Sequence, residues 1–120
     1  MGVLEEVRER LHMGMEKYGH GVRADDDTTT WGTNTNSWLE MAKEEFLDAI
    51  VYVIADYIRY MRRTDESFPK ENIDDNDLIL KIFKNFESIK SPRHKMLIWN
   101  LENMCRLDIS TPCKSKLASQ

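Results

Sequence analysis

The longest helical pattern in the chain runs from Ser37 to Arg62, and it limits the fold more than any other feature. Apolar side chains recur there at steps of three and four residues, which is the spacing of one face of an α-helix. Ser37 followed by Glu40 has the form of a capping box, which marks a helix start. Arg59 and Arg62 lie near the other end, where positive charges stabilise a helix. The stretch therefore predicts one long α-helix around which the rest of the chain packs. Its expected apolar face comprises Leu39, Ala42, Phe46, Ala49, Ile50, Val53, Tyr57 and Met61.

Two further segments, one on each side of this stretch, have helical patterns. An apolar stripe predicts a helix over residues 3–18, which the following Gly19 can end. A second stripe predicts a helix over residues 74–90, with Asp74 or Asp75 as its cap. Neither segment shows the alternating pattern of a strand, and the sequence therefore predicts an all-α protein.

The last predicted helix begins at Ser91 and Pro92, because serine is a favoured cap and proline is favoured in the first turn. With four helices, we expect a single bundle-like domain over residues 1–109. A long polar loop over residues 19–36 separates the first two helices, and residues 110–120 have the composition of a flexible tail.

Composition excludes several classes of partner. The net charge of −4 argues against duplex nucleic acid, whose phosphates bind basic patches. The chain has no run of about 18 apolar residues, so we expect no membrane partner. The first residues lack the apolar centre of a signal peptide, and the two cysteines, Cys105 and Cys113, fit reduced thiols. We therefore expect a cytoplasmic protein.

Two features predict that copies of the chain associate. The run 49–58 is apolar on nearly all sides of its helix, which is more than a small bundle can cover. Ile98 and Trp99 widen the apolar stripe of the last helix beyond what one neighbouring helix needs. We expect a homo-oligomer, either a dimer or a tetramer.

Carboxylates crowd the first half of the long helix, and they are the main chemical signal. Glu40, Glu44 and Asp48 follow one another at steps of four residues, which makes them neighbours on the helix surface. Glu45 lies three residues before Asp48 and extends the same patch. Crowded carboxylates repel one another, and a hard divalent cation such as Mg²⁺ relieves the repulsion because it takes oxygen ligands. The spacing alone favours a solvated acidic face, because helices rich in glutamate are common, but the apolar run that follows places the patch beside a core.

The loop before this helix contains residue types that suit a nucleotide. Lys17 and Arg23 are candidates for binding phosphates, Trp31 can stack on a base, and Asn34 can bind the edge of a base. A mobile surface loop is an equally good interpretation, and Lys17 is equally well explained as a cation at a helix end.

The order of these segments resembles a known family. The letters KYG at 17–19, a loop to a tryptophan and the segment WLEMAKEEFLDAIVYVIADYIR resemble phage-encoded MazG-like proteins of the all-α nucleotide pyrophosphohydrolase superfamily. Residues 44–52, EEFLDAIVY, are similar to the EExxD helix signature of that family. The resemblance covers roughly residues 4–63 and implies a MazG-type fold. It also implies hydrolysis of a nucleoside triphosphate, with dGTP as the expected substrate, to the monophosphate and pyrophosphate in the host cytoplasm.

The same resemblance implies roles for individual residues. Glu45 and Asp48 match the metal ligands of the E-x-x-D motif, with Glu44 beside them, and Mg²⁺ or Mn²⁺ is the implied cofactor. Glu44 or Glu40 is the candidate catalytic carboxylate that accepts a proton. Two rival functions are a non-catalytic helical interaction module and a nucleotide-binding sensor without hydrolysis.

The chain departs from the family pattern in one respect, because no clear E-x-x-E helix lies at the usual distance upstream. The missing ligands could come from Glu40, from the first helix with Glu6 and Glu9, or from a neighbouring subunit. Alternatively, EEFLD is the first motif, and Glu71 with Asp74 forms the second.

Overall fold

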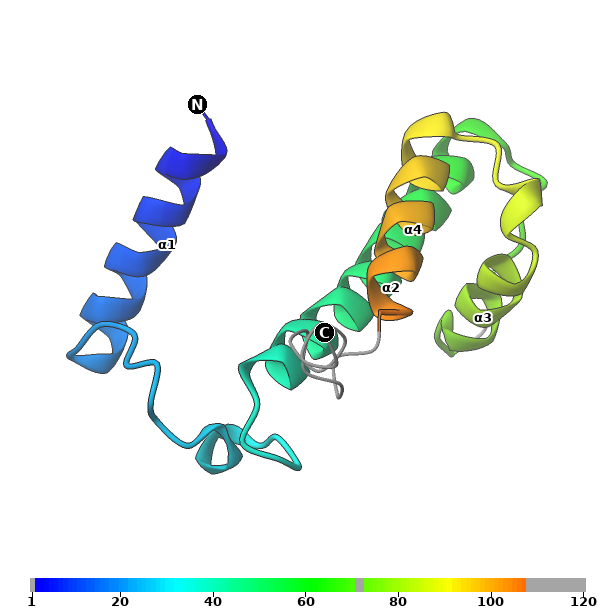
Figure 1. Ribbon diagram of the computed structural model, residues 1–120. Coiled ribbons are helices and arrows are strands. Elements are labelled where there is room, and N and C mark those ends of the chain that lie inside the picture. Colours follow the sequence, from blue (N-terminus) through cyan, green and yellow to red (C-terminus); the bar gives the residue numbers. More distant parts are fainter. Residues whose placement is uncertain (1, 71–72, 108–120) are drawn as a thin grey trace, which may run out of the picture. The chain divides into compact units, whose positions relative to one another are not determined.

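The protein is described here by a computed structural model that covers residues 2–70 and 73–107. Every regular element in these residues is helical, which confirms the all-α prediction. The contacts divide the chain into two compact units, with the boundary after Asn36. The predicted tail over 110–120 lies outside the described residues, and the single domain stays a prediction. The elements are α1 (Val3–Tyr18), the 3-10 turn η1 (Thr28–Trp31), α2 (Trp38–Thr64), α3 (Asn76–Lys84), the 3-10 turn η2 (Phe86–Ser88) and α4 (Pro92–Cys105), labelled in Figure 1 where there is room.

Helix α1 in the first unit has the predicted bounds. It ends at Gly19, which has a φ of 83° and donates its N–H to the carbonyl of Met15 at 2.9 Å. A positive φ is a conformation that glycine adopts without steric cost, which is why the helix ends at this position. No residue of α1 is buried.

The second half of the polar loop is tied together by threonine and asparagine side chains. Thr28 is fully buried, and its hydroxyl lies 2.8 Å from the hydroxyl of Thr33. The backbone N–H of Thr28 donates to the side-chain oxygen of Asn36 at 2.9 Å. Asp27 caps η1 by accepting the N–H of Thr29, also at 2.9 Å. These bonds satisfy buried polar groups, as an ordered loop requires.

Helix α2 begins where the sequence predicts, but only its second half is buried. The hydroxyl of Ser37 accepts the N–H of Glu40 at 3.0 Å, which confirms the predicted cap. The buried residues of α2 start at Ile50, whereas Leu39 is 57% exposed, so the predicted apolar face is wrong at its N-terminal end. Helices α3 and α4 supply the reason, because the core that they form with α2 contains only residues from Ile50 onwards.

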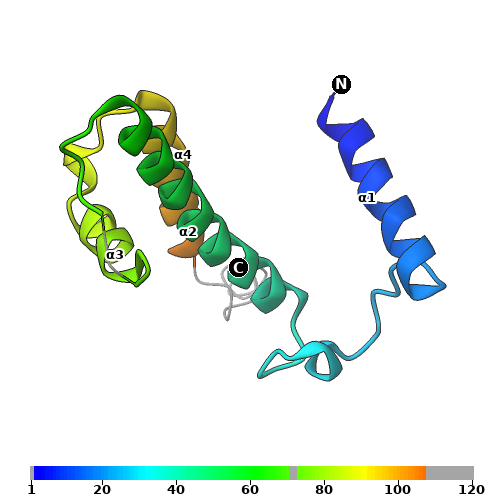
Figure 2. The ribbon, with the colours of Figure 1, turned by 180° about the vertical axis from the view of Figure 1, so that it is seen from behind.

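The core of the second unit forms where α2 meets α4 and α3. Ile54 of α2 and Ile98 of α4 are fully buried, and Leu78 of α3 is 3% exposed. Figure 2, which shows the structure from behind, has α4 lying along α2 as in Figure 1. The guanidinium of Arg62 donates two hydrogen bonds to Asp75, at 3.1 and 2.7 Å, and so joins the end of α2 to the start of α3.

The predicted third helix is too long. Helix α3 ends at Lys84, because the N–H of Asn85 is shared between the carbonyls of Lys81 and Ile82, and η2 follows. At the other end, Asp75, one of the two predicted candidates, is the N-cap residue, but its side chain makes no capping hydrogen bond. The carboxylate of Asp74, one residue earlier, accepts the N–H of Asn76 at 3.0 Å. The apolar stripe continues beyond the helix because 3-10 and turn residues also face the core.

The last helix begins as predicted, whereas one expectation about its apolar face needs correction. The expectation about α2 agrees with the structure: Val51 and Tyr52 are 44% and 67% exposed, so the described residues leave part of the apolar run 49–58 uncovered, as the sequence predicts. Ile98 is buried inside the chain's own core and is not available to a partner, whereas Trp99 is 56% exposed. In the part of the chain that the structure describes, no helix is long and apolar enough to cross a membrane.

Candidate functional site

The acidic patch predicted from the sequence lies on the first half of α2. Glu44, Glu45 and Asp48 are exposed, and Glu40 is partly exposed. Within residues 2–70 and 73–107, the side chains of Glu44, Glu45 and Asp48 form no ion pair or hydrogen bond. Helical spacing places Glu45 and Asp48 one turn apart, and Glu44 and Asp48 likewise. The arrangement offers carboxylate oxygens in pairs on a rigid helix.

The carboxylate pairs do not form a metal site in which protein side chains supply all the ligands. Among the described residues, no group of three or more histidine, cysteine or acidic side chains is placed to hold a metal ion. Mg²⁺ needs few protein ligands, because it keeps several waters and commonly takes one or two carboxylates together with substrate phosphates. A carboxylate pair such as Glu45 and Asp48 therefore suits Mg²⁺ that arrives with a triphosphate. The predicted alternative ligand Glu71 lies outside the described residues.

The predicted substrate-binding residues belong to the first unit. Arg23 donates to Asp26 at 3.1 Å and contacts the ring of His20 at 3.1 Å, so its guanidinium already has local partners. The ammonium of Lys17 lies over the ring of Tyr18, 5.3 Å from its centre. Trp31 ends the turn η1 and is 49% exposed.

Asn34 is an exposed loop residue between Thr33 and Thr35. The hydrogen bonds of Thr28 with Thr33 and Asn36 close the loop around it. Within this unit, Asn34 therefore belongs to an ordered segment. The prediction that it contacts a base stays a prediction.

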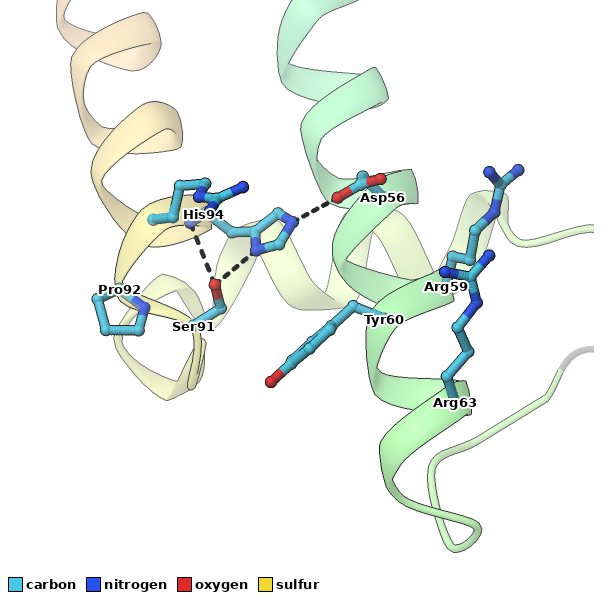
Figure 3. Close-up of a pocket in the computed structure, with 8 residues that line it drawn as sticks. Asp56, Arg59, Tyr60, Arg63, Ser91, Pro92 and His94 are labelled. Atoms are coloured by element: carbon cyan, nitrogen blue, oxygen red, sulfur yellow. Dashed lines mark hydrogen bonds and ion pairs between the residues drawn. The ribbon is translucent and has the colours of Figure 1, made fainter.

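A second polar cluster, which the sequence did not predict, joins α2 to the start of α4. The Nε2 atom of His94 lies 2.7 Å from Asp56, and its Nδ1 atom lies 2.6 Å from the hydroxyl of Ser91. An ionised carboxylate can only accept, so Nε2 carries the proton that is shared with Asp56. In neutral His94, the Nδ1 atom then accepts the hydroxyl proton of Ser91. Figure 3 shows this chain of three side chains between the two helices.

Packing holds the imidazole of His94 in place. The residue is 8% exposed, and its ring centre lies 5.5 Å from that of Tyr57 and 6.2 Å from that of Tyr60. The hydrogen bond from His94 is the main cause that lowers the pKa of Asp56 below 3.8, and the positive charges of Arg59 and Arg63 add to it. The carboxylate of Asp56 is therefore ionised at neutral pH.

An open pocket of about 340 Å³ lies over this cluster. Asp56, Arg59, Tyr60 and Arg63 of α2 line it, together with residues 91–94 at the start of α4. In Figure 3, Asp56 and Tyr60 lie between the start of α4 on the left and the two labelled arginines on the right. The pocket thus combines three arginines with one carboxylate.

The residue types Ser91, His94 and Asp56 are those of a nucleophilic triad, but the geometry is that of a helix cap. The hydroxyl of Ser91 accepts the N–H of His94 at 3.3 Å and so caps α4. A serine nucleophile also needs N–H donors for the developing oxyanion, and the residue after the nucleophile often supplies one. Here that residue is Pro92, which has no N–H. We therefore assign the three side chains to the connection between α2 and α4.

Sequence reasoning missed this cluster because its members are far apart in the chain. Asp56 and His94 are 38 residues apart, and neither follows a recognisable motif. One local signal was present: a histidine three residues after the capping serine can return a bond to the cap. That signal locates the imidazole at the start of α4, but it does not identify Asp56.

Comparisons of the chain with family models, with curated proteins and with solved structures found no match in any of the three.

Proposed function

We propose that the chain is a divalent-metal-dependent nucleoside triphosphate pyrophosphohydrolase with a MazG-type helical bundle. The observation that carries the proposal is the state of the EEFLD segment on α2. Its acidic side chains, Glu44, Glu45 and Asp48, lie exposed on one continuous helix and have no ion pair within the described residues. These carboxylates are accessible to a cation, and the pairs Glu44/Asp48 and Glu45/Asp48 lie one helical turn apart.

The residues divide the chemical work as follows. Glu45 and Asp48 bind Mg²⁺ or Mn²⁺, and Glu44 or Glu40 accepts a proton from the attacking water. Held by Glu45 and Asp48, such an ion would supply Lewis-acid chemistry, lowering the pKa of water for attack at the α-phosphorus and offsetting charge on the leaving pyrophosphate.

Association of copies belongs to the same proposal. Leu47, Val51 and Tyr52 are 48%, 44% and 67% exposed on α2, next to the acidic residues. Exposed apolar side chains grouped on one helix are typical of a surface that another chain covers. We propose a dimer or a tetramer, in which a second copy brings further ligands to the metal.

The test measures pyrophosphate release from the common ribo- and deoxynucleoside triphosphates, dGTP first, with Mg²⁺, Mn²⁺ or EDTA. We expect metal-dependent release that is lost in Glu45→Gln and in Asp48→Asn. Asp77→Asn, which removes an exposed carboxylate from α3, is the matched control and should release pyrophosphate at the wild-type rate. If no nucleotide gives pyrophosphate release with either metal, the proposed enzymatic activity is refuted.

Melting curves distinguish the two rival functions, a nucleotide-binding sensor and a non-catalytic interaction module, from the proposed enzyme. A ligand that is present at 100 times its dissociation constant stabilises a protein by about 2.7 kcal/mol. We expect Mg²⁺ with a nucleotide to raise the melting temperature of the wild-type protein but not that of Asp48→Asn. The same rise without turnover would identify a nucleotide sensor, and no rise at all would favour a non-catalytic interaction module.

A further inference from the structure

The pocket between α2 and the start of α4 has a charge opposite to that of the whole chain. The net charge of the chain is −4, whereas Arg59, Arg63 and Arg93 line this pocket with Asp56 as the one carboxylate. The local excess of positive charge is therefore not a consequence of a basic composition. It results from the fold, which places arginines of two helices on the lining of one pocket.

The guanidinium groups of these three arginines do not take part in the contacts that hold the described helices together. Within residues 2–70 and 73–107, none of them forms an ion pair or a hydrogen bond. Arg62 shows the contrast, because its guanidinium binds Asp75 and the carbonyl of Pro69. Asp56 interacts with Arg59 and Arg63 through its charge, but its Oδ2 atom is bound to His94. The donors of the three arginines are thus available to a ligand.

The start of α4 adds to the positive character of the pocket. Residues 91–94 line it, and α4 is a 14-residue helix, so the positive end of its dipole lies at the pocket. Pro92 has no N–H, and the N–H of His94 is bound to Ser91. The N–H of Arg93 is then the one in this first turn that the cap does not use.

The size and the walls of the pocket indicate a small organic anion. Its volume of about 340 Å³ is at the lower end of the range for small-molecule sites. The ring of Tyr60 and that of Pro92 supply apolar surface beside the cations. Guanidinium groups match phosphate oxygens in geometry and charge better than they match a single carboxylate.

We propose that this pocket binds a small phosphate-bearing anion, with Arg59, Arg63 and Arg93 contacting its phosphate oxygens. The site needs no metal and shares no residue with the acidic patch. It therefore does not depend on the proposed hydrolase activity.

The experiment is calorimetric titration of the full chain with inorganic phosphate, pyrophosphate and dGMP, in EDTA and at constant physiological ionic strength. We expect saturable binding, with pyrophosphate or dGMP binding more tightly than phosphate. Tighter pyrophosphate would identify a diphosphate site, and tighter dGMP would identify a site for a phosphate with an organic group. Absence of saturable binding of all three would overturn the proposal.

Variants locate the binding. Arg59→Gln and Arg93→Gln should each weaken the binding of the best probe by about tenfold or more, since each removes charge-assisted hydrogen bonds. Lys84→Gln removes one exposed positive charge from α3 and is the matched control, with an expected change of less than twofold. An equal loss in all three variants would show that only net charge matters and would overturn the proposal.

A measurement on the wild-type chain does not depend on how the variants fold. The ring signals of His94 should shift in the NMR spectrum during the titration, because its residue lines the pocket. His12 and His20 lie in the first unit and should not shift with the same affinity. Glu45→Gln should bind the probe as the wild type does, which separates this site from the proposed catalytic residues.

Discussion

Replacing Ile54 by alanine should remove a large part of the free energy of unfolding of the second unit. The side chain of Ile54 is 0% exposed at the centre of the core that α2 forms with α3 and α4. Truncation of such an isoleucine costs about 2–5 kcal/mol, because apolar surface is lost and a cavity is left. We take the middle of this range, about 3–4 kcal/mol, for the completely buried Ile54. With about 4 °C of melting temperature per kcal/mol, the expected decrease is roughly 12–16 °C.

The matched control is Val51→Ala, one turn earlier on the same helix. Val51 is 44% exposed, so its truncation should change the free energy of unfolding by less than about 0.5 kcal/mol in a single chain. Urea denaturation followed by circular dichroism, together with thermal melts, measures both variants. A loss of less than about 1 kcal/mol for Ile54→Ala would refute the core described above. A large, concentration-dependent loss for Val51→Ala would instead indicate that a second copy covers this face.

Two further substitutions test the start of α2 and the connection between α2 and α4. Ser37→Ala should lower the free energy of unfolding by about 1 kcal/mol, measured by urea denaturation, because the hydroxyl that accepts the N–H of Glu40 is lost; Ser37→Asp, which keeps an acceptor, should be much closer to the wild type. Asp56→Asn should lower the melting temperature at neutral pH. The pKa of Asp56 is lowered from 3.8 in the folded protein, so the ionised carboxylate stabilises the fold above this value, and the contribution is lost as the pH falls through the lower folded pKa. Melts across an acid titration should therefore converge for the two proteins, and a difference that persists in strong acid would contradict the bond to His94.

Helix starts could be predicted from the sequence because the signals are local. The caps at Ser37 and Ser91 each act on a backbone N–H three residues later, within the same turn. The stop at Gly19 likewise depends on one residue that adopts a positive φ. Such features need no knowledge of the rest of the fold.

The end of α3 and the extent of the core depend on distant contacts and were not predictable in the same way. Phe86 and Ile89 continue the apolar pattern of α3, but they face the core from a 3-10 turn and the residue after it. Leu39 continues the pattern of α2, but no part of the described core reaches it. Periodicity identifies which residues are apolar at helical spacing, and it does not specify where the neighbouring helices begin and end.

The two candidate sites also differ in how far the sequence alone could predict them. The acidic patch on α2 is contiguous in the sequence, so its spacing was visible at once. The arginine pocket exists only because α4 returns to α2, so that Arg93 lines the same pocket as Asp56 and Arg59. No sequence window contains both halves of that pocket.

Helix α2 carries surfaces of opposite charge, and their separation determines how the two proposals relate. Asp48 and Arg59 are eleven positions apart (59 − 48 = 11) on one helix, which corresponds to about 16 Å at 1.5 Å per residue. At physiological salt, charges on the surface are screened over about 8 Å, so the acidic patch and the arginines act as separate sites. A bound metal ion at Glu45 and Asp48 should therefore leave the anion affinity of the pocket within about twofold of its value in EDTA. A tenfold or larger increase with Mg²⁺ would mean instead that one phosphate chain contacts both surfaces, and the pocket would then be part of the catalytic site.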